Sequence, residues 1–444
     1  AAGFSNAIIG KLAPSEEEDP DWDPEDARIS SIRWLPADIK NAFGPHVSDP
    51  RTGEILEADV RMYHNVMTLV RDWYFSQAAA VDERAQKLPL PDDLMGELVR
   101  FVVAHEVGHS LGFPHNFKAS NSYTVEQLRD PEWTAKNGTA PSIMDYARFN
   151  YVAQPGDGAA LMPNVGPYDF FACEWGYRQF AEDADEKDEL EKLVKAQIDE
   201  PMFRFGGGFG DPSSQTEDLT GDAVEATRLG LLNLQRIAGF LVEASCDEGE
   251  DYDLLANMYE QLWAQWNREM GHVANVVAGV QQVNLFYGDA EQRYFPVEPA
   301  RQRQAVMFLL ENALGEPDPA LVSEDIVARL SPTGVAKRVG GAQFRVLGSL
   351  MNSGRINRMA ELAQRGEAYT VPEFTPAMRT GAIAAFGHPG PRHPTLRRRH
   401  LPRQQVATLP AAIATPAGLA AHPPLPRPAR PPSAAFLVLA RNAP

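Results

Sequence analysis

The sequence predicts an α+β protein, in which a small mixed sheet with helices is followed by a mainly helical region. Residues 1–184 mix strand and helix patterns. Residues 185–373 place apolar residues at the three- and four-residue spacing of amphipathic helices. Residues 374–444 contain no Asp, Glu or Lys and are rich in Pro, Ala and Arg. We therefore expect three parts, with boundaries after residues 184 and 373.

Two stretches of the first part predict strands. Residues 27–36 (ARISSIRWLP) alternate polar and apolar residues and end at a proline, as a strand often does. Residues 44–63 place the turn sequence DPRTG between two extended runs, which indicates a hairpin.

Helices are expected in both of the first two parts. Residues 92–112 (DDLMGELVRFVVAHEVGHSLG) have helical periodicity, with Asp92 or Asp93 as the N-cap. The longest periodic stretches of the second part are residues 226–244, 253–280 and 300–314. The glycine-rich stretch FRFGGGFGD (203–211) predicts a flexible link between helical parts.

The last part differs sharply from the rest in charge. Residues 1–373 carry a formal net charge of −28, whereas residues 374–444 carry nine arginines and no acidic residue. A segment of this composition is expected to be disordered, because it cannot bury a core. It is either a genuine basic tail, with RRRH at 397–400 as an interaction segment, or GC-rich coding sequence read out of frame.

The overall composition narrows the classes of partner. A net charge of −19 argues against nucleic acid and against anionic membrane surfaces. No apolar run reaches the length of a membrane span, and no signal-peptide pattern is visible. The two cysteines, Cys173 and Cys246, are either free thiols or a single bridge.

Residues 105–115 (HEVGHSLGFPH) carry the strongest chemical pattern. His105 and His109 lie one helical turn apart, so both rings can reach one metal ion. Glu106 lies about 100° around the helix from His105, where it can reach a water as a general base without binding the metal. A bare HExxH occurs by chance in many helices, whereas the extended pattern is far more specific.

The residues after the second histidine predict a third ligand. Gly112 tolerates the positive φ that ends a helix, and Pro114 prevents the helix from continuing. The chain must turn, which allows His115 to return as a third nitrogen ligand. Three protein ligands with an open fourth position are typical of a catalytic zinc.

A second element follows in SIMDYARFN, which contains Met144 and Tyr146. A methionine after an extended zinc motif is expected to form an apolar floor beneath the ligand imidazoles. The alternative is an ordinary core methionine, which is what most methionines are.

These motifs resemble the metzincin clan of zinc metallopeptidases and, within it, a bacterial family of large zinc-dependent metalloproteases called Met-zincins. The likeness is most specific over residues 89–180 and weaker to about residue 370. It rests on DPDWDPEDARISSIRW, GPHVSDPRTGEI, LPLPDDLMGELVRFVVAHEVGHSLGFPHNFKAS, PSIMDYARFNYVAQPGDG and GPYDFFACEWGY. It implies a metzincin-like domain with a small mixed sheet, a zinc-binding helix and a Met-turn.

The resemblance also implies roles for individual residues. His105, His109 and His115 match the ligands of one catalytic Zn²⁺. Glu106 matches the base, and Met144 matches the Met-turn methionine. Tyr146 matches a tyrosine that lies near the metal and hydrogen-bonds the tetrahedral intermediate in astacins and serralysins. The alternative is a packed core tyrosine.

The resemblance further implies location and extent. Family members are exported in bacteria to the periplasm or beyond. They carry the first strand and most of the first helix of the catalytic domain before a stretch like AAGFSNAI, so we expect this chain to be truncated at its N-terminus.

The expected function is that of a zinc-dependent endopeptidase acting on a protein or peptide substrate. Glu106 would take a proton from the attacking water and pass it to the leaving amine. The hairpin strand around residues 47–60 is either a sheet edge along which an extended substrate pairs, or an interior strand. The rival expectation is a catalytically inert zinc-binding fragment or interaction module.

Three other features carry weaker expectations. His64 and His272 are expected to be structural histidines rather than ligands. The acidic, hydroxyl-rich segment 211–222 is either a calcium site or, more in keeping with its spacing, a solvated loop.

Overall fold

The computed structural model describes residues 4–5, 7–207, 210–290, 292–366 and 369–387, together with the backbone of residues 436–441. The strands are β1 (Ile8–Leu12), β2 (Ser30–Leu35), β3 (Ala42–Phe43), β4 (His46–Ser48), β5 (Ile55–Ala58), β6 (Val60–Tyr63), β7 (Val280–Gln282), β8 (Tyr294–Pro296) and β9 (Phe436–Arg441). The helices are α1 (Val66–Ala78), α2 (Asp92–Ser110), α3 (Val125–Leu128), α4 (Pro131–Asn137), α5 (Pro167–Tyr177), α6 (Glu186–Asp199), α7 (Ala223–Ser245), α8 (Asp253–Val276), α9 (Pro299–Asn312), α10 (Glu324–Leu330), α11 (Ala336–Leu350), α12 (Ser353–Gln364) and α13 (Val371–Gly387). Short 3₁₀ turns include η3 (Pro201–Phe203).

The main sheet has the strand order β1-β9-β2-β6-β3. β2 pairs in parallel with β6, with Ile32 opposite Val60, and the other neighbours run antiparallel. β4 and β5 form a separate antiparallel pair around the DPRTG turn, where Gly53 adopts φ +76°. The strand predicted at residues 27–36 and the hairpin are therefore confirmed, and residues 60–63 join the main sheet as β6.

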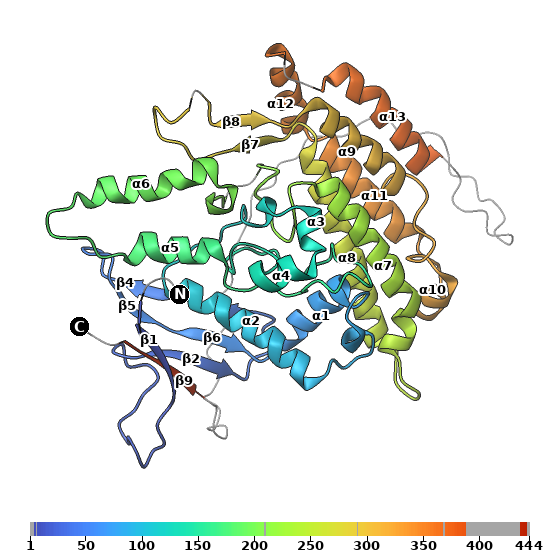
Figure 1. Cartoon of the computed structure of the whole chain (residues 1–444). Helices are drawn as coiled ribbons and strands as arrows, with labels where there is room; N and C mark the ends of the chain where they lie inside the picture. The colour runs from blue at the N-terminus through green and yellow to red at the C-terminus, as the bar shows by residue number, and fades with distance from the viewer. Residues whose placement is uncertain are drawn as a thin grey trace, which may run out of the picture.

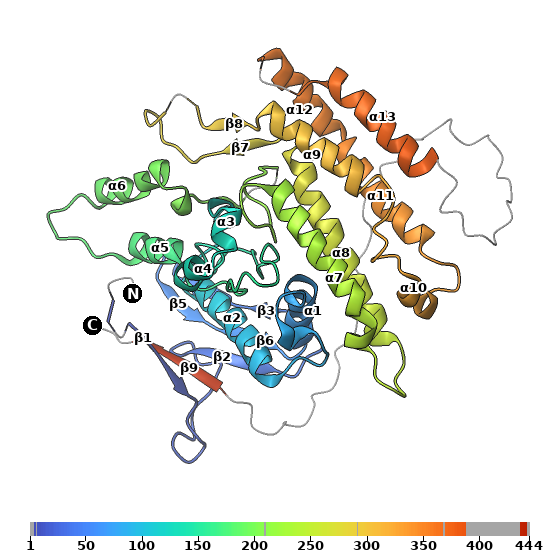
Figure 2. The same ribbon diagram turned by 45° about the vertical axis from the view of Figure 1, so that its right-hand side comes forward.

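The α+β prediction is confirmed, because helices dominate the chain after the sheet (Figure 1). α7 and α8 lie side by side, and α9, α11 and α13 extend the same helical layer (Figure 2). One hydrophobic cluster joins this layer to the sheet and to α2: it includes Val60, Leu98, Leu234 and Leu262. The helical region thus packs directly on the half that carries the histidines.

α2 begins differently from the prediction. Neither Asp92 nor Asp93 is the N-cap, which is instead Pro91, whose φ of −58° and ψ of 149° hold it outside the helix. Both carboxylates lie in the first turn, where they favour the helix through its dipole rather than by capping.

The expectation that disorder begins at residue 374 is wrong. α13 runs from Val371 to Gly387, because Phe374 and Met378, spaced four apart, are buried against the helical layer. Residues 436–441 form β9, between β1 and β2. Residues 388–435, including the RRRH segment, lie outside the described residues.

The predicted flexible link at 203–211 lies partly outside the described residues, which omit 208 and 209. Its described part is fixed by Asn116. The Asn116 Nδ2 donates to Arg204 O at 3.0 Å, and Gly206 N donates to Asn116 Oδ1 at 3.0 Å. The link is therefore attached to the chain immediately after His115.

The segment 211–222 is not a solvated loop. Ser213, Glu217, Asp218 and Thr220 are buried, so the expectation drawn from its polar composition is wrong. Its polar groups find partners elsewhere in the chain: Lys118 Nζ lies 2.8 Å from Asp211 Oδ2. Within the described residues, no calcium-type group of three clustered carboxylates is found.

Cys173 and Cys246 are both free thiols. His64 accepts a hydrogen bond from Trp34 Nε1 at 3.1 Å, and His272 lies buried on α8 with its Nε2 2.9 Å from Thr216 O. Both histidines therefore make hydrogen bonds within the fold, as expected for structural histidines. Within the described part of the chain, no helix is both long and apolar enough to cross a membrane.

His272 predicts acid sensitivity. Burial lowers its pKa to about 4, whereas an unfolded histidine titrates near 6.5. The unfolded chain therefore binds more protons between these values, and the stabilisation is complete above pH 6.5 and lost as the pH falls towards 4. We expect the free energy of unfolding to drop by about 3 kcal/mol over this window because of this residue.

Urea unfolding of the metal-free protein from pH 4 to 7.5 measures this loss. His272→Gln keeps a donor for Thr216 O but does not titrate, so its pH dependence should be shallower than that of the parent. Parallel curves for the two proteins would contradict the assignment.

Candidate metal centre

The end of α2 and the turn after it bring the three histidines together. His105 and His109 lie one turn apart on α2, which ends at Ser110. Gly112 then adopts φ +83°, and Gly112 N donates to His109 O at 2.9 Å. Pro114 keeps the helix from resuming, and His115 returns towards the other two rings. The local signals in the sequence thus account for this turn.

The ring nitrogens of the histidines converge on one point. The Nε2 atom of His115 lies 3.2 Å from Nε2 of His105 and 3.0 Å from Nε2 of His109. Ligand atoms at about 2.0–2.1 Å from a tetrahedral zinc lie about 3.3 Å from one another. The donor set is therefore of the size and chemistry that zinc requires.

Hydrogen bonds from the second ring nitrogen, Nδ1, fix the tautomers of His105 and His109. The Nδ1 of His105 lies 2.7 Å from Ile143 O, and that of His109 lies 2.8 Å from Phe113 O. Each Nδ1 must carry the hydrogen, which leaves the Nε2 lone pair directed to the common point. Burial lowers the pKa of His105 to about 3 and that of His115 to about 4, so the rings are neutral, as metal ligands must be.

Met144 lies beneath the helix that bears the ligands. It is buried, and its Sδ packs against Gly108, where a Cβ would overlap the sulfur. Sequence reasoning missed Gly108. The available signal was a glycine inside a predicted helix, which lowers helix stability and usually occurs where another side chain packs closely. The contact holds Met144 against α2 next to His109, and its role as an apolar floor beneath the imidazoles stays a prediction.

Asp169 holds the Met144 turn in place, and sequence reasoning assigned it no role. The buried carboxylate accepts from Ser142 Oγ at 2.6 Å, from Ile143 N at 2.8 Å and from Gly166 N at 2.8 Å. Ile143 in turn supplies the carbonyl that orients His105. The sequence did carry a signal for this role of Asp169: it is the third residue of α5, a helix that begins at Gly166-Pro167, where an acidic side chain commonly caps the helix start.

Glu106 is buried beside the histidines. Burial raises its pKa to about 7, and the backbone N–H of Gly44 donates to its carboxylate. A Cβ at Gly44 would lie 3.1 Å from Glu106 Oε2 and would overlap the Glu106 carbonyl, so only glycine fits there. Gly44 is a third site residue, after Gly108 and Asp169, that sequence reasoning missed.

Tyr146 lies against two of the ligands. Its ring centroid is 4.3 Å from that of His115 and 5.3 Å from that of His105. Glu217 N donates to Tyr146 O at 2.8 Å, and the Glu217 carboxylate pairs with Arg148 at 2.6 Å. Glu217 also pairs with Arg268 on α8, so the helical region reaches the residues around Tyr146.

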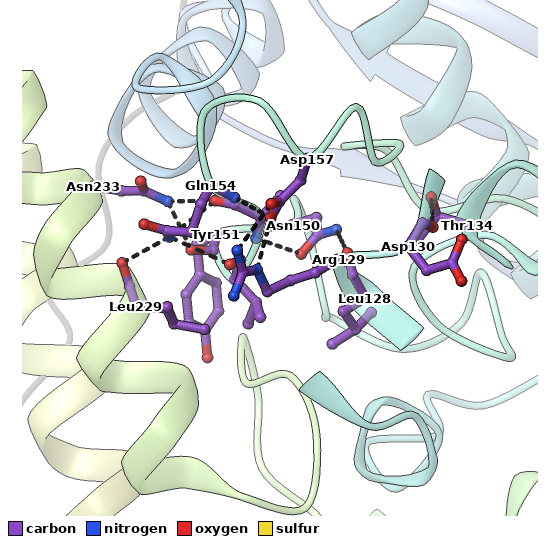
Figure 3. Close-up of polar contacts among 12 residues, drawn as sticks. Leu128, Arg129, Asp130, Thr134, Asn150, Tyr151, Gln154, Asp157, Leu229 and Asn233 are labelled. Atoms are coloured by element: carbon purple, nitrogen blue, oxygen red, sulfur yellow. Dashed lines mark hydrogen bonds and ion pairs between the residues drawn. The ribbon is translucent and has the colours of Figure 1, made fainter. Parts of the chain in front are cut away.

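The segment after Tyr146 is tied to its surroundings by buried amides (Figure 3). Asn233 on α7 donates to Tyr151 O at 2.9 Å and to Ala153 O at 2.8 Å. Asn150 donates to Leu128 O at 2.7 Å. These bonds hold the loop rigidly on α7 and α3, and with it the residues next to the metal centre.

The β4–β5 hairpin lies beside the metal-binding helix. His46 Nδ1 is 3.1 Å from His109 O, and a Cβ added at Gly112 would lie 3.4 Å from Ile55 Cδ1. β4 pairs only with β5 among the described residues, so its other edge has no strand partner there. β4 is therefore an edge strand among the described residues, as the expectation of substrate pairing along residues 47–60 requires, and not an interior strand.

Comparison with known proteins agrees with this geometry. A family model described as Met-zincin matches residues 87–389, which is more than half of the chain and includes the three histidines, Glu106 and Met144. No curated protein and no solved structure matches the chain. On the strength of the family match and the histidine geometry, the chain belongs to the Met-zincin family.

Proposed function

We propose that this chain is a zinc-dependent endopeptidase in which Glu106 is the general base. The Met-zincin family implies zinc metalloprotease activity. The observation that carries the proposal is the convergence of three Nε2 atoms beside a buried carboxylate. Zinc held there would supply a Lewis acid and lower the pKa of a water to about 7.

The residues of the chain have distinct tasks in this proposal. His105, His109 and His115 hold the ion, and Glu106 accepts a proton from the attacking water and returns it to the leaving amine. The N–H of Gly44 keeps the Glu106 carboxylate in place between these transfers. A glutamate would have no reason to be buried here in a purely structural zinc site.

An extended substrate would pair with the free edge of β4. Backbone hydrogen bonds along such an edge give affinity with little dependence on sequence. This proposal is supported by the position of β4 beside α2, where His46 approaches His109 O. Export to the bacterial periplasm or beyond is proposed on the family resemblance alone.

Digestion of an unfolded protein by the zinc-loaded chain tests the proposed activity. An endopeptidase should create new internal N-termini, which mass spectrometry identifies. Release of single residues from the ends would indicate an exopeptidase. The absence of any product from the zinc-loaded chain would favour the rival reading of an inert zinc-binding protein.

Tyr146 is proposed to stabilise the reacting carbonyl through its hydroxyl. Tyr146→Phe should lower kcat by about 10- to 100-fold and leave the zinc content and KM nearly unchanged, because only a transition-state hydrogen bond is lost. Steady-state kinetics and metal analysis on the same samples measure both. Loss of zinc or of folding in this variant would assign Tyr146 a structural role instead.

A further inference from the structure

A large cleft opens beside the metal centre, with a volume of about 1390 Å³. One wall is the turn formed by residues 110–114, which joins the second histidine to the third. The β4–β5 hairpin, α5, α6, η3 and residues 284–286 form other parts of the lining, together with the N-terminal residues Phe4, Ala7 and Ile8. α5 lies beside the hairpin in both views, on the side away from the α7–α8 layer (Figures 1 and 2).

Many aromatic side chains line this cleft. They include Phe113, Phe171, Trp175, Phe203, Phe205 and Phe286. Trp175 is 49% exposed and Phe286 is 51% exposed, so these rings face an accessible space rather than a sealed core. Among the described lining residues, the side chains that are charged at neutral pH are those of Glu54 and Arg293, although the chain carries a net charge of −19.

The cleft is rigidly connected to the metal centre. Tyr177 Oη, at the end of α5, donates to Leu111 O at 2.7 Å, two residues after His109. Phe171 stacks on Phe203 with ring centroids 4.8 Å apart, which joins α5 to η3. Phe113 both lines the cleft and supplies the carbonyl that orients His109.

The size and chemistry of the cleft indicate its occupant. It is larger than the 300–1,000 Å³ typical of sites for small molecules. An accessible apolar surface of this kind marks a binding site. A polypeptide lying along β4 would run past the cleft and direct alternate side chains into it, because successive side chains of a strand point to opposite faces.

We infer that this cleft binds apolar and aromatic side chains of an extended polypeptide substrate, so that the protein selects hydrophobic segments exposed in unfolded chains. The inference rests on the proposed peptidase function, since that function places the substrate between the metal centre and β4. The cleft would set which segments are bound, while the metal centre performs the cleavage.

Binding to an inactive variant tests the inference apart from catalysis. The probes are two fluorescent peptides of equal length and net charge, one with Phe and Leu at alternate positions and the other with Ser and Gln there. Zinc-loaded Glu106→Gln protein should bind the apolar peptide at least tenfold more tightly, measured by fluorescence anisotropy.

Filling the cleft provides the matched comparison. Gly176 on α5 lines the cleft, and a Cβ there would meet no atom within 4 Å, so the backbone at this position has room for a side chain such as that of Gly176→Phe. Gly239 on α7 is equally unobstructed and does not line the cleft. In the Glu106→Gln background, Gly176→Phe should weaken binding of the apolar peptide at least fivefold, and Gly239→Phe should leave it unchanged.

The outcomes separate the cleft from the catalytic proposal. Equal affinity for the two peptides, or no effect of Gly176→Phe in a protein that melts like Gly239→Phe, overturns the inference. Selective binding by a protein whose active form cleaves neither peptide supports the cleft and removes the peptidase proposal. Equal cleavage of both peptides by the active form supports the peptidase and removes the cleft.

Discussion

The Glu106→Gln variant should bind one zinc ion per chain and lose about 10²- to 10⁴-fold in kcat, the usual contribution of a general base. Glutamine keeps the size of the side chain and still accepts from Gly44 N–H, but it cannot take up a proton from water. The three histidine ligands are untouched. Cleavage of a quenched fluorescent peptide, with metal analysis of the same sample, measures both quantities.

Glu97→Gln is the matched control for this variant. Glu97 lies on the same helix, α2, and pairs with Arg84 on the surface, away from the histidines. The same chemical change there should leave kcat and zinc content unaltered. A Glu106→Gln protein that cleaves as fast as this control would exclude Glu106 as the base, and one that loses its zinc would make Glu106 a structural residue.

Asp169→Ala should destabilise the protein by about 3–5 kcal/mol and weaken zinc binding. The change leaves three buried donors without an acceptor, each at a cost of about 1–3 kcal/mol before relaxation. One of these donors belongs to Ile143, whose carbonyl orients His105. Loss of the aspartate therefore disturbs the turn under the metal centre as well as the fold.

Asp169→Asn separates hydrogen bonding from charge. The Asn amide oxygen can accept from Ile143 N and Gly166 N, while its NH₂ group donates to Ser142 Oγ. This variant should lie within about 1 kcal/mol of the parent in urea unfolding. Equal stability of the alanine variant and the parent would show that Asp169 does not hold the turn.

The parts of the site that sequence reasoning predicted depend on local rules. The spacing of His105 and His109 follows from helical periodicity. The return of His115 follows from Gly112 and Pro114, because one permits a positive φ and the other cannot continue a helix. Strand β2 and the β4–β5 hairpin likewise follow from alternation and turn residues.

The parts that were missed depend on contacts between distant segments. Gly44 is required because β3 and β4 bring the backbone against Glu106, and Gly108 because Met144 packs on α2. Neither of these two close contacts can be predicted from the residues adjacent in the sequence. The segment 211–222 shows the same limit, since its polar composition suggests solvent and its partner Lys118 lies far away in the sequence.

Titration of zinc into the metal-free chain, with cleavage of an unfolded protein as the readout, tests the central claim most directly. Three convergent histidines predict that activity is absent without metal and rises in proportion to zinc until one equivalent is bound. Full activity in the metal-free chain, or no activity when one equivalent is bound, would contradict the assignment of this centre as a catalytic zinc site.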